Sequence, residues 1–234
     1  MPATARADTN DRFSRTFALP AGRAVRLDAT VADLTIVGSD RADVAVEIVR
    51  HAPSAADLAK YPVVVDDGPN ALHIVVTQSD EGRDPNLRTD ISIAGPATAI
   101  FEAVRLFEGH VRLTNLRGAC DVDLRRGPIE ASGVAGRVRL ESGIGSVTVR
   151  QAELTPGGMM RLRVFNGPLR VRFARPPANG RILAVTFNGS ITSDIPLTTK
   201  DKFGPRFGET TIGSGDPVMS VDVVKGDITI GIGK

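Results

Sequence analysis

Apolar and polar positions alternate through the middle of the chain, and a glycine interrupts the alternation every nine residues. The glycines are Gly109, Gly118, Gly127, Gly136 and Gly145. The second and fourth residues after each are apolar, and side chains two apart on a strand share a face, so the pattern predicts strands with one buried face. Glycine fits the corners between them, where positive φ or close backbone approach penalises a Cβ. The predicted inward residues are Val111, Leu113, Cys120, Val122, Ile129, Ala131, Val138, Leu140, Val147 and Val149.

The same alternation continues on both sides of this block. Towards the C-terminus it surrounds Gly167, Gly189 and Gly226, and Gly145, Gly167 and Gly189 are spaced 22 residues apart. Towards the N-terminus Ala32 takes the place of the glycine. The additional inward residues are predicted to be Val25, Leu27, Ala29, Leu34, Ile36, Val44, Val46, Ile48, Met160, Leu162, Val164, Leu169, Val171, Ile182, Ala184, Thr186, Ile191, Met219, Val221, Val223, Ile228 and Ile230.

The segments that lack the regular repeat define the expected domain organisation of the chain. Residues 1–12 are polar and are predicted to be a disordered tail, followed by one β-solenoid domain over 13–234. Within that domain we expect N-terminal coils over 13–78, a polar loop over 79–90 and the main repeat region over 91–234. Residues 62–76 contain two apparent strands. Residues 97–107 fit a short helix or a strand, and the strand is favoured because the repeat follows directly.

The nine-residue period predicts an all-β fold, a single-stranded parallel β-helix in which two half-coils make an 18-residue coil. Residue i then lies beside residue i+18, which pairs Arg112 with Glu130 and Asp121 with Arg139 as opposite charges. The same register places the carboxylates of Asp123 and Glu141 side by side.

The alternative arrangement is a meander of antiparallel hairpins. Asn166-Gly167 and Asn188-Gly189 are strong two-residue turn signals, and such turns would make their flanking strands antiparallel.

The repeated units FNGPLRV, FNGSITS and VKGDITI, together with the opening VRLDATVADLTIVGSDRADVAVEI, resemble the bacterial putative-adhesin family over roughly residues 13–234. That family consists of glycine-punctuated β-strand-repeat domains of unknown function. The resemblance implies a single-stranded β-helix, frequently at the bacterial cell envelope, and it implies no catalytic or ligand residue.

The amino-acid composition argues against some kinds of partner and location. Lys and Arg total 29 against 27 Asp and Glu, spread along the chain, and there are nine Phe, one Tyr and no Trp. Nucleic acid is therefore not expected as a partner. There is no apolar run that could span a bilayer and no recognisable export signal at the start, so the chain as written is expected to be cytoplasmic, or an envelope or secreted protein if a signal has been removed.

Candidate chemistry is sparse. No nucleophile, phosphate-loop or metal-ligand motif occurs, so no catalytic residue, metal or cofactor is expected. Cys120 occupies an inward slot, which predicts a buried thiol. Asp123 and Glu141 form a ladder of the kind that polysaccharide-cleaving β-helices use, although Arg139 can neutralise it.

The candidate ligand site is a group of arginines around the Asn166-Gly167 turn, expected to converge on an anionic ligand. These are Arg161, Arg163, Arg170 and Arg172, with Arg175 following. Guanidinium groups suit carboxylate and phosphate oxygens. The sequence therefore predicts a non-catalytic β-repeat interaction module, adhesin-like, whose partner is a protein, a glycan or an anionic envelope component. The alternatives are a polysaccharide-active β-helix enzyme or a cytoplasmic scaffold or sensor, and the oligomeric state is not predicted.

Overall fold

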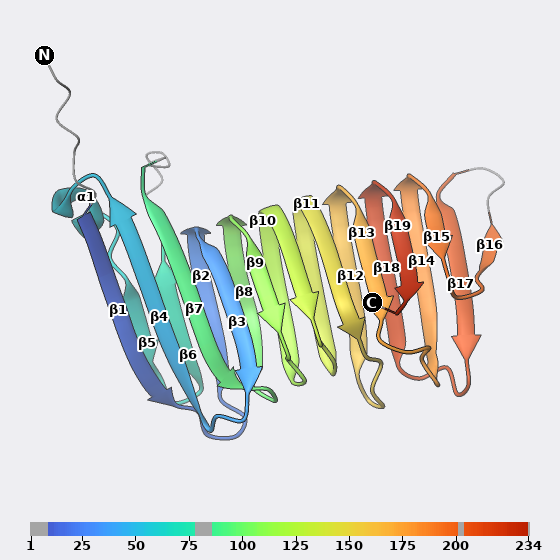
Figure 1. Ribbon diagram of the computed structural model, residues 1–234, viewed down its shortest axis with the longest axis horizontal. Coiled ribbons are helices and arrows are strands. Elements are labelled where there is room, and N and C mark those ends of the chain that lie inside the picture. Colours follow the sequence, from blue (N-terminus) through green and yellow to red (C-terminus); the bar gives the residue numbers. More distant parts are fainter. Residues whose placement is uncertain (1–8, 78–85, 201–203, 234) are drawn as a thin grey trace, which may run out of the picture.

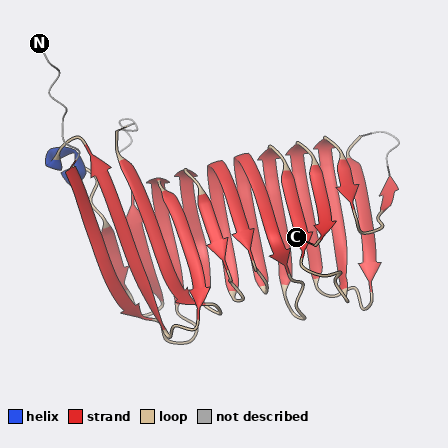
Figure 2. Ribbon diagram, in the orientation of Figure 1, coloured by secondary structure: helices blue, strands red, loops and turns tan. Residues whose placement is uncertain are grey.

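The computed structural model describes residues 9–77, 86–200 and 204–233, and the regular secondary structure of these residues is almost all β-strand (Figures 1 and 2). Hydrogen bonds link 19 strands into one mixed sheet. The described chain includes one short helix, α1 (Ala55–Ala59), capped by the Ser54 hydroxyl, which accepts a hydrogen bond from the Asp57 amide. No helix in the described ranges is long and apolar enough to cross a membrane. The all-β prediction is confirmed.

The strands form two ladders. The chain passes from the first to the second at Gly109, Gly127, Gly145, Gly167, Gly189 and Gly226, which we call the corner glycines, and it returns at Gly118 and Gly136. Ladder A contains, in order of pairing, β5 (Val64–Asp67), β6 (Ala71–Val76), β2 (Ala24–Val31), β8 (Ile100–Glu108), the first part of β10 (Ala119–Ser132), the first part of β11 (Arg137–Ala152), β12 (Met159–Asn166), β18 (Val218–Lys225), β14 (Gly180–Asn188), β17 (Arg206–Ile212) and β16 (Thr198–Lys200). Ladder B contains β1 (Thr9–Ala18), β4 (Asp43–Ala52), β7 (Arg88–Pro96), β3 (Asp33–Ser39), β9 (Val111–Thr114), the second parts of β10 and β11, β13 (Leu169–Phe173), β19 (Ile228–Ile232) and β15 (Ile191–Ser193). The ladders follow the long axis of the molecule (Figure 1).

The central strands have the predicted register. β10 pairs with β11 in parallel, with each residue beside the one 18 positions later. Glu130 lies beside Arg112, and Arg139 lies beside Asp121; these are the two opposite-charge pairs that the sequence predicts. Asp123 lies beside Glu141, as the same register predicts.

Inward side chains of both ladders meet in one hydrophobic cluster. Every predicted inward residue is buried except Ile191, which is partly buried on the edge strand β15. Several buried residues were not predicted, among them Phe101, Phe173, Leu116 and Val134. Leu116 lies two residues before Gly118, and Val134 lies two residues before Gly136. The simple alternation of apolar and polar residues is interrupted at both places.

Residues 97–107 form no helix, so that possibility was wrong. They contribute to β8, which begins at Ile100, as the favoured strand interpretation required. The register shifts between Cys120 and Val122, where Ala103 on β8 adopts φ 50°. This bulge turns Phe101 into the core and leaves Ile100 only partly buried.

Two boundary predictions need correction. Residues 9–12, placed in the disordered tail, begin β1, which pairs antiparallel with β4. The last residues of the predicted loop over 79–90 belong to β7, which begins at Arg88. The remainder of that loop over 78–85 and of the tail over 1–8 lies outside the described residues.

Neither Asn-Gly pair forms a hairpin. β12 and β13, which flank Asn166-Gly167, pair with different neighbours, and so do β14 and β15, which flank Asn188-Gly189. Antiparallel pairing is confined to strands towards the two ends of the ladders.

Gly145, Gly167 and Gly189 are equally spaced in sequence, but they are not consecutive in space. Gly145 and Gly167 are adjacent, but β18 lies between β12 and β14, so Gly226 separates Gly167 from Gly189.

A column of glycines holds the corner between the ladders. A Cβ built on Gly145 would lie 2.0 Å from the carbonyl oxygen of Gly127, and one on Gly167 would lie 1.6 Å from that of Gly145. Both glycines also have positive φ, 155° and 140°. Successive backbones therefore touch at this corner, and no side chain fits between them.

Gly145→Ala should lower the free energy of unfolding by about 3 kcal/mol, because a methyl group would be forced against a backbone carbonyl. The control is Gly157→Ala, since Gly157 also has positive φ but would meet no atom within 4 Å. That variant should lose about 1 to 2 kcal/mol, the cost of the backbone conformation alone. Equal losses in urea titrations would contradict the close-approach explanation.

Leu140→Ala should lower the free energy of unfolding by about 2 to 5 kcal/mol, because Leu140 is 1% exposed and its truncation leaves a cavity. The neighbouring Arg139→Ala should cost under about 1 kcal/mol, because that side chain forms ion pairs on the surface. Similar midpoint shifts for the two variants in denaturant titrations would show that the faces are wrongly assigned.

Candidate functional site

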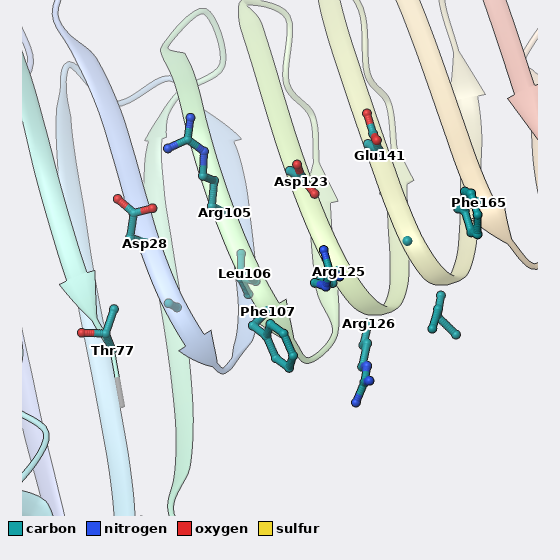
Figure 3. Close-up of a pocket in the computed structure, with 13 residues that line it drawn as sticks. Asp28, Thr77, Arg105, Leu106, Phe107, Asp123, Arg125, Arg126, Glu141 and Phe165 are labelled. Atoms are coloured by element: carbon teal, nitrogen blue, oxygen red, sulfur yellow. The ribbon is translucent and has the colours of Figure 1, made fainter. Parts of the chain in front are cut away.

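A groove of about 700 Å³ runs along the outward side of ladder A, beside the glycine corner. It crosses β2, β8, β10, β11 and β12 (Figure 3). Apolar side chains lie next to the corner together with Arg125 and Arg126, and the other charged side chains form a wall farther up the strands. We call the first set the lip (Phe107, Ile144 and Phe165) and the second the charged wall (Asp28, Arg105, Asp123 and Glu141).

The hollow exists because one strand lacks a side chain at the level of the lip. By the register of ladder A, Gly143 on β11 lies between Arg125 on β10 and Phe165 on β12. A Cβ on Gly143 would lie 2.6 Å from the carbonyl oxygen of Arg125. The tight backbone packing that requires glycine here therefore also opens the space between its neighbours.

The lip exposes apolar surface to water. The side chains of Phe107, Ile144 and Phe165 are 37%, 52% and 60% exposed. The Arg126 guanidinium lies over the ring of Phe107, 5.5 Å from its centre, which is a cation–π contact. Clustered exposed apolar groups mark surfaces that a partner covers.

The charged wall is a row with one position on each strand. Asp28 pairs with Arg105, Arg105 with Asp123, and Asp123 with Glu141. Arg163 on β12 continues the row beyond Glu141, with its Nη1 atom 3.9 Å from Oε1 of Glu141. Charges alternate along the row except where Asp123 and Glu141 lie side by side.

Arg139 balances that acidic pair. It donates hydrogen bonds to Asp121 at 2.9 Å and to Glu141 at 3.0 Å. Glu141 is therefore held as an ion-paired carboxylate by arginines on its own strand and the next. The pKa of Asp123 is raised, first by partial burial and then by the charge of Glu141, while Arg139 and Arg105 oppose the rise.

The four predicted arginines do not converge. Arg161 and Arg163 lie on β12 in ladder A, whereas Arg170 and Arg172 lie on β13 in ladder B. Because both ladders turn their inward faces to one core, their outward side chains point away from each other. The expectation of convergence was wrong, since it assumed that strands joined by an Asn-Gly turn share a sheet face. Of the four, only Arg163 approaches the groove.

Of the residues that line the groove, the sequence singled out Asp123 and Glu141; the lip and the neighbouring arginines were missed, although a signal was present. Phe107, Phe165 and Phe187 each lie two residues before a corner glycine. That position points outward, so repeated Phe there is unexpected for a solvated face. Arg125 and Arg126 also precede a corner glycine, and neither attracts notice without its neighbours on the adjacent strands.

Other predicted residues have ordinary environments. Cys120 is buried as predicted, and burial raises the pKa of its thiol to about 12. His73 lies 2.7 Å from a carboxylate oxygen of Asp28 through its Nε2 atom. Within the described parts of the chain, no three His, Cys, Asp or Glu side chains gather as metal ligands.

No protein-family model matches the chain, and no curated protein sequence matches it. Its structure is similar to that of a putative cell adhesion protein from Clostridium sporogenes ATCC 15579, with a TM-score of 0.55 and 11% sequence identity over 96% of this chain and 100% of that one. At this identity the likeness shows a shared fold.

Two other solved structures align with lower scores. A putative adhesin from Bacteroides fragilis NCTC 9343 has a TM-score of 0.34 and 12% identity, covering 95% of this chain and 97% of the other. A putative adhesin from Parabacteroides distasonis ATCC 8503 has a TM-score of 0.31 and 10% identity, with the same coverage.

The carboxyl group of Asp123 should titrate above the ordinary aspartate range, and Glu141→Gln should lower its pKa, because the substitution removes a neighbouring negative charge and releases Arg139. NMR titration of the side-chain carbon measures both values. A raised folded-state pKa penalises the ionised form, so the penalty grows as pH rises through the unfolded and then the folded pKa. Asp123→Asn should therefore stabilise the protein at neutral pH more than at about pH 3. An unchanged pKa in Glu141→Gln would contradict the electrostatic explanation.

Proposed function

We propose that this chain is a non-catalytic binding module, in which a parallel β-helix holds a ligand groove along one edge. The observation that carries the proposal is the lip, three exposed apolar side chains on β8, β11 and β12 beside an arginine-containing wall. The acidic and basic side chains of the groove would orient the ligand, and the lip would supply apolar contact.

The pairing pattern supports the β-helix as the scaffold. β10 and β11 run through both ladders and stay in register on either side of their corner glycines. Inward side chains of the two ladders share one core. A coil built in this way, from about residue 9 to residue 233, would keep the groove residues at fixed spacing from strand to strand.

The contacts available in the groove favour binding. Full burial of an exposed Phe or Ile side chain contributes about 1.5 to 3 kcal/mol, and covering the exposed part of each lip residue contributes a share of that energy to ligand binding. Arg105, Arg125 and Arg126 offer guanidinium forks that match carboxylate or phosphate oxygens. Because these groups come from neighbouring strands, an extended ligand lying across the strands would contact several of them.

The state of the acidic pair supports a role without catalysis. Both oxygens of Glu141 are engaged, one by a hydrogen bond from Arg139 at 3.0 Å and the other by an ion pair with Arg163 at 3.9 Å, so this carboxylate has a structural role on the strands. The alternative is a polysaccharide-cleaving enzyme, and one observation favours it: the pKa of Asp123 is raised beside a second carboxylate, an arrangement that acid catalysis uses. The solved structure from C. sporogenes is named a putative cell adhesion protein, and a binding role is in line with that name.

The experiment measures binding to alginate, dextran sulfate, neutral dextran and vesicles of phosphatidylcholine with phosphatidylglycerol, while assaying each polysaccharide for cleavage. Phe165→Ser with Arg125→Ser should weaken binding about tenfold or more, because it removes an apolar contact and a charge from the groove. The matched control is Arg170→Ser with Arg172→Ser on ladder B, which should leave binding unchanged.

Three results would overturn the proposal. The first is binding that survives in the groove variant but is lost in the ladder B variant. The second is cleavage of a polysaccharide that Asp123→Asn or Glu141→Gln abolishes, which would establish the enzyme. The third is absence of binding to every probe.

A further inference from the structure

We infer that the glycine edge of ladder A is a contact surface for an anionic lipid bilayer. The inference rests on the proposed function, because it names the partner of the lip, and it adds residues beyond the groove. Its basis is a row of outward positions, each two residues before a corner glycine, which we call the edge row.

The edge row takes one residue from each of six neighbouring strands. In spatial order it runs through Phe107, Arg125, Gly143, Phe165, Val224 and Phe187. Phe165 and Phe187 are 60% and 64% exposed, the highest values among the exposed large hydrophobic residues of the described chain. Val224 lies between them on β18, so the apolar surface continues past the groove to β14.

The shape of the edge row suits a flat partner. Six strands at the usual spacing of neighbouring strands place its two ends about 24 Å apart along a nearly straight line. Its side chains point to the outward side of ladder A beside the corner, and Gly143 leaves the hollow of the groove between Arg125 and Phe165. A pocket for a single small molecule would instead enclose its ligand on several sides.

Cationic side chains lie beside the apolar ones, and they indicate that the partner surface is negatively charged. Arg125, Arg126 and Lys225 are exposed at this edge. The acids at the same edge each have a partner: Glu108 pairs with Arg126 across the strands, Asp227 accepts hydrogen bonds from the amide and hydroxyl of Ser190, and Asp33 accepts one from the amide of His110. Asp123 and Glu141 of the charged wall lie farther from the corner, where Arg139 approaches both. Exposed aromatic side chains with cations beside them are the combination that binds interfacially to anionic membranes.

Other occupants fit less well. A peptide strand cannot add here, because the strands of the edge row already have hydrogen-bonded neighbours on both sides, so the edge row offers side chains only. A second copy of this chain meeting the same edge by two-fold symmetry would bring Arg125, Arg126 and Lys225 towards their own equivalents. A bilayer surface with negative headgroups satisfies both the apolar and the charged groups.

The test is co-sedimentation with vesicles of phosphatidylcholine alone and of phosphatidylcholine with phosphatidylglycerol. The native protein should partition onto the anionic vesicles, and high salt should weaken the partitioning. Phe187→Ser should reduce the partition coefficient about tenfold, because it removes one of the exposed Phe side chains that the bilayer would cover. The control is Val64→Ser, which removes another exposed apolar side chain, 52% exposed, from β5, away from the edge row.

Charge is tested in the same assay. Arg125→Gln, Arg126→Gln and Lys225→Gln combined should abolish the preference for phosphatidylglycerol. The control with the same change in net charge is Arg150→Gln, Arg170→Gln and Arg172→Gln on ladder B, which should retain it. All these side chains point outward, so circular dichroism should report unchanged β structure in each variant.

Phe187 is not among the residues that line the groove, which separates the two proposals. If Phe165→Ser abolishes polysaccharide binding while native protein ignores both vesicles, the lipid inference is wrong and the binding module stands. Equal partitioning onto both vesicles would overturn the anionic preference. A dimer in sedimentation velocity that Phe187→Ser dissociates, without vesicle binding, would assign the edge row to a second copy.

Discussion

Contact between successive backbones at the glycine corner is the constraint on which the rest of the molecule depends. Gly127, Gly145 and Gly167 each lie against the carbonyl group of the glycine on the preceding coil, so a Cβ at any of them would overlap main-chain atoms. This contact fixes the register of the strands on both sides of the corner. Inward positions then stack on inward positions, and outward positions form rows. The charged wall and the edge row are both products of that alignment.

The sequence predicted the strands and their faces well, because the alternation of apolar and polar residues is a local signal. It correctly placed Leu140 inside and correctly paired Asp121 with Arg139. It could not predict that β18 lies between β12 and β14, because inward positions on all three strands are interchangeably apolar and say nothing about which strand is the neighbour. The bulge at Ala103 was likewise hidden, since an extra residue shifts the alternation without a distinctive side chain.

The candidate site was harder to predict than the fold. Proximity in sequence suggested that Arg163 and Arg170 act together, yet the corner between them sends their strands into different ladders. The groove instead combines residues such as Asp28, Arg105 and Phe165, which are far apart in sequence and adjacent only across the strands. Its hollow depends on the absence of a side chain at Gly143, and the importance of that absence is visible only once the neighbouring strands are known.

The position of β18 and β19 between β12–β13 and β14–β15 has a consequence for how the molecule assembles. During synthesis β14 and β15 leave the ribosome before the strands that will separate them from β12 and β13. Until β18 and β19 are synthesised, β14 and β15 lack their parallel partners. The edges of β12 and β13 are also open, and β14 could pair there in place of β18. Folding of this end therefore waits for late, long-range pairing, which is the slow and aggregation-prone kind.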